Sequence, residues 1–409
     1  MEHHGAFFKN ASNKTELALE QNRTSWNFLQ TRFPSGSLDL IPPRKFSFSS
    51  TTMLCVVTCS HKSTLLDISM PLLRLLVLLL HLAAINSFAE TTKDISSETC
   101  AMSSSKFRSV RKVLPKPSAH WVGDGFKVFP VFANLAFTEE ISPLLMFDYA
   151  EPRKFPGKVG APLGVGSHPH RGFETVTLAF QGEVEHHDST GKTGIIGAGD
   201  VQWMTAGRGI IHEEYHSKEF TKSGGMFEFC QLWVNLPKKS KMSKPGYQGI
   251  LNKNIPVVNL PLNADADSVL GTARIIAGEL GEIKGTAKTF SPVQMWDVNI
   301  PNAGSEIDLP FPSDHNCIIF VRRGSVEILS GEMDDKLKGQ KLGPQDVALM
   351  RMDGSDILRI RVTQSDSSIM ILGGEPLNEP IAAQGPFVMN TKDEIHKAMA
   401  DFRAGKMGK

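Results

Sequence analysis

Two histidines one residue apart, His168 and His170, lie between small residues and an apolar run in the stretch GSHPHRGFETVT. In an extended strand, residues i and i+2 face the same side at a spacing of roughly 6–7 Å. Pro169 favours such a strand, because the residue before a proline is pushed towards extended conformations. The pair predicts half of a metal site, and its alternative is two histidines that only make hydrogen bonds.

A second pair with the same spacing, His212 and Glu214, occurs in GRGIIHEEYH, after the predicted strand DVQWM and a glycine-rich turn. Two facing strands that each offer such a pair place three imidazoles and one carboxylate around one ion. That donor set suits Fe(II), Mn(II), Co(II), Ni(II) or Zn(II), and with four protein ligands iron keeps open positions for water, O₂ or substrate. The two pairs together predict a metal site.

Glu174, on the strand that follows the first pair, is the alternative fourth ligand. If the strand alternation continues unbroken from His170, the side chains that face the interior with the histidines belong to Glu174, Val176, Leu178 and Phe180. Three further histidines, His186, His187 and His216, are expected at the rim or surface. Cys230 and Cys317 are expected to be buried thiols, because no cysteine pattern suggests a disulfide framework.

An internal repeat bears on the choice of ligand. FQGEVE (180–185) resembles RRGSVE (322–327), and GAGDVQWM (197–204) resembles GPQDVALM (343–350). Short glycine-bounded strands in both halves predict an all-β protein with two tandem barrels or sandwiches.

In this alignment Glu174 falls opposite the polar Asn316. The four preferred ligands, in chain order, fall opposite Pro310, Pro312, Leu358 and Ile360. The whole ligand set is thus replaced in the second half, and we prefer Glu214 to Glu174.

The composition changes along the chain. Residues 1–101 are predicted to be a disordered or targeting extension with an apolar segment at 70–89, which is a plausible signal peptide if translation starts at Met70. A start at Met70 or Met102 is a further alternative. The first domain is expected at 102–236, a linker and crossover at 237–265, and the second domain at 266–409. A short helix with Asn390 or Thr391 as N-cap and Glu394 in a capping box closes the chain.

The motifs HPHRGFETVT, GDVQWMTAGRGIIHEE, QLWVNLP and GEPLNEPIAAQGPFVMNT resemble signatures of the pirin family of two-domain cupins, from about Met102 to the C-terminus. The resemblance implies two tandem cupin (jelly-roll) barrels, with iron in the N-terminal one and no metal in the C-terminal one. It places the three histidines and the glutamate of the family's iron site on His168, His170, His212 and Glu214. One departure is Glu213, where an alanine is more usual.

The resemblance also suggests two functions. As an enzyme, the protein would be a quercetin 2,3-dioxygenase that uses Fe(II) to insert O₂ into a flavonol, with Glu214 as ligand and proton acceptor. As a non-enzymatic regulator, it would join transcription or G-protein signalling complexes through a redox-sensing iron site. A monomer in cytoplasm and nucleus is expected, and the apolar segment raises the secretory pathway or membrane association as the alternative. The net charge of +1 gives no support for direct nucleic-acid binding.

Overall fold

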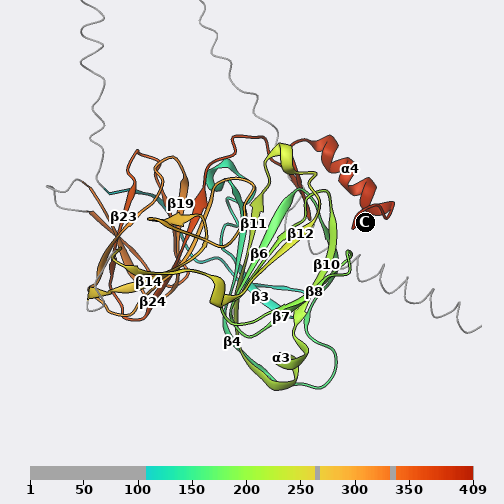
Figure 1. The fold of residues 1–409 in the computed structure, drawn as a ribbon, viewed down its shortest axis with the longest axis horizontal. Helices are drawn as coiled ribbons and strands as arrows, with labels where there is room; N and C mark the ends of the chain where they lie inside the picture. The colour runs from blue at the N-terminus through green and yellow to red at the C-terminus, as the bar shows by residue number, and fades with distance from the viewer. Residues whose placement is uncertain (1–106, 263–267, 332–337, 409) are drawn as a thin grey trace, which may run out of the picture. The chain divides into compact units, whose positions relative to one another are not determined.

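The computed structural model describes residues 107–262, 268–331 and 338–408 (Figure 1). The expected N-terminal extension at 1–101 and its apolar segment at 70–89 lie outside the described residues. Strands dominate the described chain, which confirms the all-β prediction. In these described ranges, none of the helices is long and apolar enough to span a membrane.

The first barrel consists of a large and a small antiparallel sheet. The large sheet contains, in order, β12 (Gly246–Ile250), β9 (Val201–Thr205), β6 (Phe173–Gln181), β11 (Gly224–Asn235), β4 (Leu144–Pro156), β3 (Phe126–Pro130) and β2 (His120–Val122). The small sheet contains β5 (Gly164–His170), β10 (Ile210–His216), β7 (Val184–Asp188) and β8 (Thr193–Ile196). Its short helices are α3 (Lys218–Ser223) and the 3-10 turns η1 (Glu139–Ile141), η2 (Lys238–Ser240) and η3 (Asn252–Asn254).

The second barrel repeats this plan. Its large sheet contains β1 (Val110–Leu114), β22 (Val347–Met350), β19 (Asn316–Arg323), β24 (Ser367–Gly374), β17 (Val293–Ile300), β14 (Gly271–Ala277) and β13 (Val257–Leu260). Its small sheet contains β18 (Glu306–Pro310), β23 (Ile357–Val362), β20 (Val326–Ser330) and β21 (Lys338–Leu342). Three smaller elements complete the chain: the hairpin β15 (Glu279–Leu280) and β16 (Ile283–Lys284), the hairpin β25 (Ala382–Gln384) and β26 (Phe387–Met389), and the helix α4 (Lys392–Arg403).

The repeated sequence motifs form the same turn in both barrels. In the first, Asp200 Oδ2 accepts a hydrogen bond from the Gly197 amide at 3.0 Å. In the second, Asp346 Oδ2 accepts one from the Gly343 amide at 2.8 Å. The two large sheets also correspond strand by strand, with β1 in the place of β12. The internal repeat therefore reflects two copies of one architecture, as the sequence predicts.

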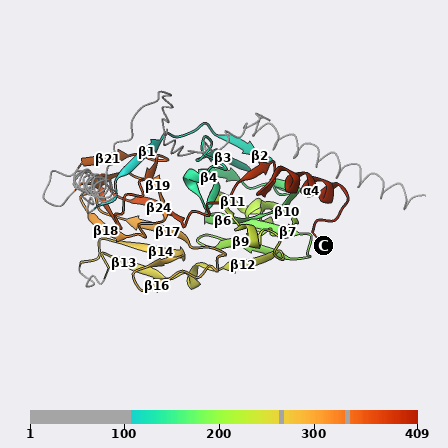
Figure 2. The same ribbon diagram turned by 90° about the horizontal axis from the view of Figure 1, so that it is seen from above.

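The barrels do not follow the domain boundaries expected from the sequence. β1 begins the described chain, yet it pairs with β22 in the second barrel. β12, within the expected linker at 237–265, pairs with β9 in the first barrel. At the other end, α4 lies beside the first barrel, to which an ion pair joins it (Figure 2). Strand pairing, which no local pattern specifies, decides these assignments. The helix itself matches its prediction, because Thr391 and Glu394 form the capping box.

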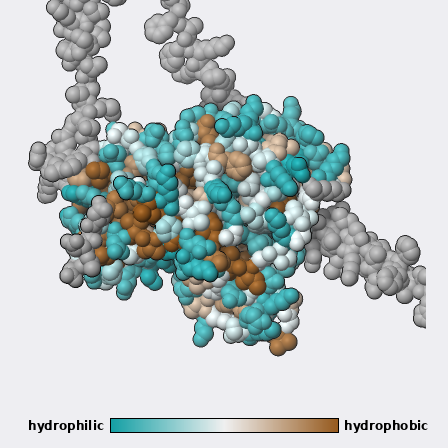
Figure 3. Space-filling view, in the orientation of Figure 1, coloured by the Kyte–Doolittle hydropathy of each residue, from teal (hydrophilic) through white to brown (hydrophobic). Residues whose placement is uncertain are grey.

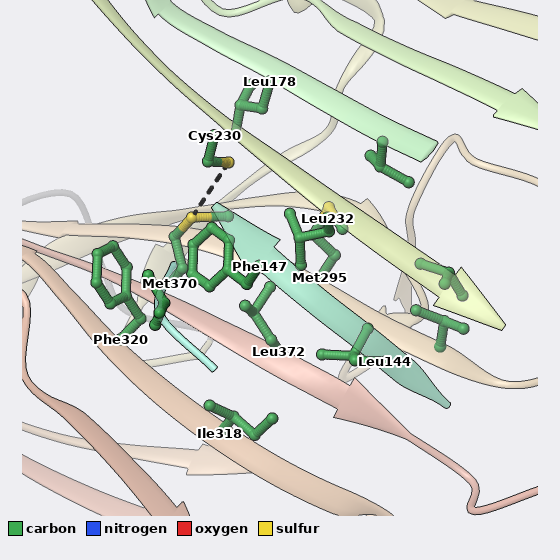
Figure 4. Close-up of a cluster of buried hydrophobic side chains, with 14 of the residues drawn as sticks. Leu144, Phe147, Leu178, Cys230, Leu232, Met295, Ile318, Phe320, Met370 and Leu372 are labelled. Carbon is green, nitrogen blue, oxygen red and sulfur yellow. Dashed lines mark hydrogen bonds between the residues drawn. The ribbon is translucent and has the colours of Figure 1, made fainter. Parts of the chain in front are cut away.

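The outer faces of the two large sheets share one hydrophobic core. Leu178, Cys230 and Leu232 of the first barrel lie in the same buried cluster as Ile318 and Met370 of the second (Figure 4). Cys230 Sγ lies 3.9 Å from Met370 Sδ across this contact. Because apolar surface buried between sheets stabilises both of them, the barrels are expected to fold and unfold together.

A buried ionic network accompanies this core. Arg322 of β19 donates to Glu228 of β11 at 2.8 Å, and the Tyr149 hydroxyl donates to the same carboxylate at 2.7 Å. Arg274 pairs with Asp297 at 2.9 Å within the second barrel. Burial, followed by the neighbouring Glu228, raises the pKa of Tyr149 far above its usual range, so the phenol stays protonated and donates. A packing of the two sheets that left one of these buried charges unpaired would be strongly destabilised.

Polar residues cover most of the face shown in Figure 3, with separate apolar patches between them. Phe290 is one of the exposed large apolar residues, at 43% exposure. Phe320, by contrast, is fully buried and meets the rings of Phe147 and Tyr149 at centroid distances of 4.9 and 5.1 Å. These two phenylalanines provide a test of the shared core.

Phe320→Ala should lower the free energy of unfolding by about 3–5 kcal/mol, because it leaves a cavity between the two sheets. Denaturant unfolding followed by both tryptophan fluorescence and far-UV circular dichroism should still show one shared, earlier transition. Phe290→Ala is the matched control and should change stability by less than about 0.5 kcal/mol. Two separate transitions, with only the second barrel weakened, would show that the barrels are independent.

A second prediction concerns β1. A chain that begins at residue 107 keeps β1, whereas one that begins at residue 115 loses its ladder with β22 and exposes that strand's edge. It also loses Arg108, whose guanidinium donates to the carbonyls of Pro312 and His315. We expect the shorter chain to melt about 5 °C lower by scanning calorimetry. Equal melting temperatures would mean that β1 contributes nothing to the second barrel.

Candidate metal centre

The first pair of histidines and His212 lie on two adjacent strands. β5 and β10 run antiparallel, with His168 opposite His212 and His170 opposite Ile210. Along β10 the residues alternate between buried and half-buried, so His212 and Glu214 share the buried side of the strand. Residues directly opposite on paired strands share one face of a sheet, which brings the three imidazoles together.

The three imidazoles form one compact group. Their ligand nitrogens all lie within 4.8 Å of one another. The ring centroid of His168 is 4.3 Å from that of His212 and 4.8 Å from that of His170. All three residues are buried, with exposures of 8%, 3% and 2% in chain order. The structure thus unites three of the four residues that the sequence singles out.

Burial keeps these histidines neutral. Desolvation lowers the pKa of His168, and together with the neighbouring imidazoles it lowers the pKa of His170 and His212 well below the usual range. His168 Nδ1 lies 2.9 Å from the Gly166 carbonyl, which orients the ring with Nε2 free. His170 Nδ1 and both ring nitrogens of His212 are buried without a hydrogen-bond partner. Neutral imidazoles with unused lone pairs are the donors that a divalent transition metal requires.

Glu214 shares the buried side of β10 but is not part of the three-histidine group. Its two carboxylate oxygens accept hydrogen bonds from Gln231 Nε2 at 3.0 and 3.1 Å. Burial raises its pKa to about 6, with opposing contributions from Gln231 and Thr177. The carboxylate lines a cavity of about 20 Å³, room for one water molecule. The Gln231 amide therefore holds the carboxylate in this cavity, two residues along β10 from His212.

Glu174 lies on the opposite face of its sheet. It pairs with Thr205, whose hydroxyl donates to Glu174 Oε1 at 2.6 Å. Its neighbours on that face, Val176 and Leu178, belong to the core between the barrels. Thr177, on the other face, lines the cavity beside Glu214. The expectation that Glu174 and these apolar residues face the interior with the histidines is therefore wrong.

Gly172 is the physical reason for this difference. It separates β5 from β6 with a φ of 89°, a conformation that interrupts the alternation of side chains between the two strands. A Cβ on Gly172 would also lie 1.9 Å from the carbonyl oxygen of Val388. The corner between the two strands thus requires glycine. Because the alternation is interrupted there, residues of β6 with the same parity as His170 do not face the barrel interior.

Of the three histidines expected at the rim or surface, two are buried. His216 lies among phenylalanine rings, with Nε2 3.1 Å from the Gly125 carbonyl, and burial lowers its pKa to about 4. His186, at 6% exposure, stacks on Tyr247. His187 is the partly exposed one, and it pairs with Glu185. His216 continues the buried alternation of β10, a signal that the sequence already carried.

Sequence reasoning missed two groups that border the site. Trp233 meets the ring of His170 at 5.3 Å and that of Phe173 at 4.2 Å. Gln231 holds Glu214. Both lie on β11 at the i, i+2 spacing, in the QLWVN stretch, so they share one face. The same alternation that identified the histidine pairs could have found them.

The second barrel has apolar residues at the equivalent positions. The β20–β23 register places Leu358 and Ile360 where His212 and Glu214 lie, as the sequence alignment predicts. Leu358 pairs with Leu309, so Leu309 corresponds to His168, and Phe311 two residues later corresponds to His170. The alignment with Pro310 and Pro312 is thus off by one residue, because the corner between His170 and Glu174 is one residue shorter than the corner between Phe311 and Asn316.

Comparisons with known proteins agree with this architecture. The Pirin family model matches residues 125–234, and the model of the Pirin C-terminal cupin domain matches residues 295–408. A Pseudomonas aeruginosa protein, named provisionally as a quercetin 2,3-dioxygenase, is 44% identical over 73% of this chain and 98% of its own. Human pirin is 36% identical over 66% of this chain and 84% of its own.

Among solved structures, quercetin 2,3-dioxygenase from Acinetobacter baumannii matches with a TM-score of 0.66 and 43% identity. The match covers 74% of this chain and 99% of that one. Its extent, together with the two family models, accounts for both barrels and the terminal helix. The chain, a two-barrel cupin with a buried three-histidine cluster in its first barrel, belongs to the pirin family.

Proposed function

We propose that the protein is a metal-dependent dioxygenase of the quercetin 2,3-dioxygenase type. His168, His170 and His212 would hold Fe(II), and Glu214 would be the fourth ligand. The observation that carries the proposal is the group of three neutral, buried imidazoles, in which His170 Nδ1 and both ring nitrogens of His212 have no hydrogen-bond partner. The names of relatives at 43–44% identity support the reaction class.

A bound Fe(II) would supply a Lewis-acidic, redox-active centre with open coordination positions. The residues around it perform the other tasks. Trp233 and Phe173 pack their rings against His170 and exclude water from that side of the site. Glu214 is the carboxylate beside the histidines, and we assign it the proton of the flavonol hydroxyl. Gln231 orients that carboxylate through its side-chain amide.

Glu214 can serve as ligand only if it turns from Gln231 towards the histidines. It lies two residues from His212 on the same side of β10, and we propose a rotation of its side chain as the movement that brings it there. Glu174 has no such route, because it faces the core between the barrels and is bonded to Thr205. We therefore keep Glu214 as the fourth ligand.

The cellular setting is also a proposal. We place the protein in cytoplasm and nucleus as a monomer, without direct nucleic-acid binding. Cys230 and Cys317 are both free and buried, which agrees with a reducing compartment. A non-enzymatic role with protein partners in transcription or signalling, expected from the family resemblance, is the outcome that a negative activity test would favour.

His168→Ala and His212→Ala should each remove the metal from the full chain. After anaerobic loading with Fe(II) and desalting, elemental analysis should find about one equivalent in the unsubstituted protein and nearly none in the variants. Fe(II) should raise the melting temperature of the unsubstituted protein alone. His187→Ala, on the partly exposed side of β7, is the control and should retain iron. Full occupancy in either ligand variant would refute the assignment.

The activity test uses the Fe(II)-loaded full chain with quercetin, and follows O₂ uptake and carbon monoxide release. Glu214→Gln should lower kcat per bound iron by about 10²–10⁴-fold, because the proton acceptor is lost. Turnover no higher than in a metal-free control would contradict the proposed reaction.

Two variants are controls for Glu214→Gln. Glu213→Gln, on the other side of the same strand, should leave turnover unchanged. Glu174→Gln keeps an oxygen that can accept from Thr205, so it should leave both turnover and iron content unchanged. Loss of iron in Glu174→Gln, with iron retained in Glu214→Gln, would exchange the roles of the two carboxylates.

A further inference from the structure

Arg171 follows His170 directly, and its charged side chain is buried at 5% exposure. The guanidinium Nε donates to the Arg208 carbonyl at 2.6 Å, and Nη1 donates to Asp401 Oδ2 at 2.9 Å. A buried guanidinium is stable only with such partners, because its desolvation is costly. The site described above does not use this residue.

The bond to Arg208 connects the two strands that carry the histidines. Arg171 belongs to the corner that follows β5, and Arg208 belongs to the turn that precedes β10. The Gly172 amide donates to the Gly207 carbonyl at 2.8 Å, so backbone also joins the corner to the turn. These contacts therefore hold the end of β5 next to His170 at a fixed distance from the start of β10, the strand of His212. A planar guanidinium with several donors in fixed directions can make both bonds at once.

Asp401 comes from the opposite end of the chain. It lies on α4 within a C-terminal arm, defined as residues 382–408, which docks on the corner. The Arg171 amide donates to the Pro386 carbonyl at 3.3 Å, and the Val388 amide donates to the Arg171 carbonyl at 3.0 Å. The buried Lys241 ammonium donates to the carbonyls of both Gly172 and Val388, at 2.9 and 3.0 Å.

The arm also reaches the turn that precedes β10. A Cβ placed on Gly209 would lie 3.0 Å from Met407 Cγ and 3.5 Å from Arg171 Nε. Met407 itself is buried, in a cluster with Phe387 and Ile395 of the arm. The arm thus packs against both segments that Arg171 joins, and Asp401 provides the charge opposite the guanidinium.

We propose that Arg171 is a positioning residue of the metal centre and that Asp401 holds it in place. Through this pair, the C-terminal arm sets the geometry of the histidines in the first barrel. The inference rests on the metal binding by those histidines proposed above. It assigns Arg171 no contact with metal or substrate.

The test measures Co(II) binding by the full chain, because Co(II) absorption reports ligand geometry as well as affinity. Arg171→Ala and Asp401→Ala should weaken Co(II) binding about 10–100-fold in competition with a chelator, and should shift the visible absorption bands. Arg171→Lys should recover part of the affinity, because one ammonium replaces the charge but not the fork of donors. Lys397→Ala removes the exposed second partner of Asp401 and should match the unsubstituted protein.

The double variant Arg171→Ala/Asp401→Ala tests whether the two residues act together or independently on Co(II) affinity. If Asp401 acts through Arg171, the double variant binds Co(II) no more weakly than Arg171→Ala alone. Additive losses would overturn the role of Asp401. If the metal-free melting curve of Asp401→Ala shows that this variant does not fold, Asp401→Asn replaces it in the test, because asparagine keeps an acceptor oxygen. Asp401→Asn should also bind Co(II) more weakly than the unsubstituted protein.

Unchanged affinity and spectrum in Arg171→Ala, with Co(II) bound by the unsubstituted protein, would overturn the inference while leaving the metal site intact. Failure of the unsubstituted protein to bind Co(II), Fe(II) or Ni(II) would instead overturn the metal site, and the inference with it. The two failures are therefore distinguishable in the same titration.

Discussion

The contact between the outer faces of the two large sheets constrains the rest of the molecule. Each barrel packs one apolar sheet face against the other barrel, and the buried pair of Arg322 and Glu228 lies beside that contact. With both outer faces covered, the interior of each barrel is left for a separate role. The second fills its interior with residues such as Leu309, Phe311 and Leu358, whereas the first places imidazoles there. One scaffold thus supports a packed core and a polar site side by side.

The polar site depends on a few backbone features as much as on its ligands. Gly172 turns the chain so that Phe173 and Thr177 face the histidines while Glu174 faces away. The apolar surroundings then keep the imidazoles neutral, since charging them inside the barrel is unfavourable. His170 Nδ1 and both ring nitrogens of His212 are buried without a hydrogen-bond partner. A site so arranged favours a metal ion over a proton, because only the ion can satisfy three lone pairs together.

The features of the fold and of the site that depend on residues close together in the sequence were predictable. The i, i+2 spacing of His168 and His170, the repeated turn motifs and the capping box of Thr391 all express short-range geometry, and the structure agrees with them. Long-range pairing was not predictable. Nothing in residues 110–114 indicates β22 as their partner. A corner after His170 that is one residue shorter than its counterpart moves the counterparts of His168 and His170 from prolines to Leu309 and Phe311. Arg171 was hidden for the same reason, because its partner is 230 positions away.

The placement of the C-terminal arm has a consequence for biosynthesis. The strands that carry the histidines are complete once residue 216 has been made, but the arm that covers their corner, at residues 382–408, is translated later. At roughly 5–20 residues per second, the approximately 190 residues between His212 and Asp401 take about 10–40 s to synthesise. During that interval the ligands exist without their cover, on a ribosome-bound chain. The contacts between the arm and the histidine strands can therefore form only after the rest of the site has been synthesised.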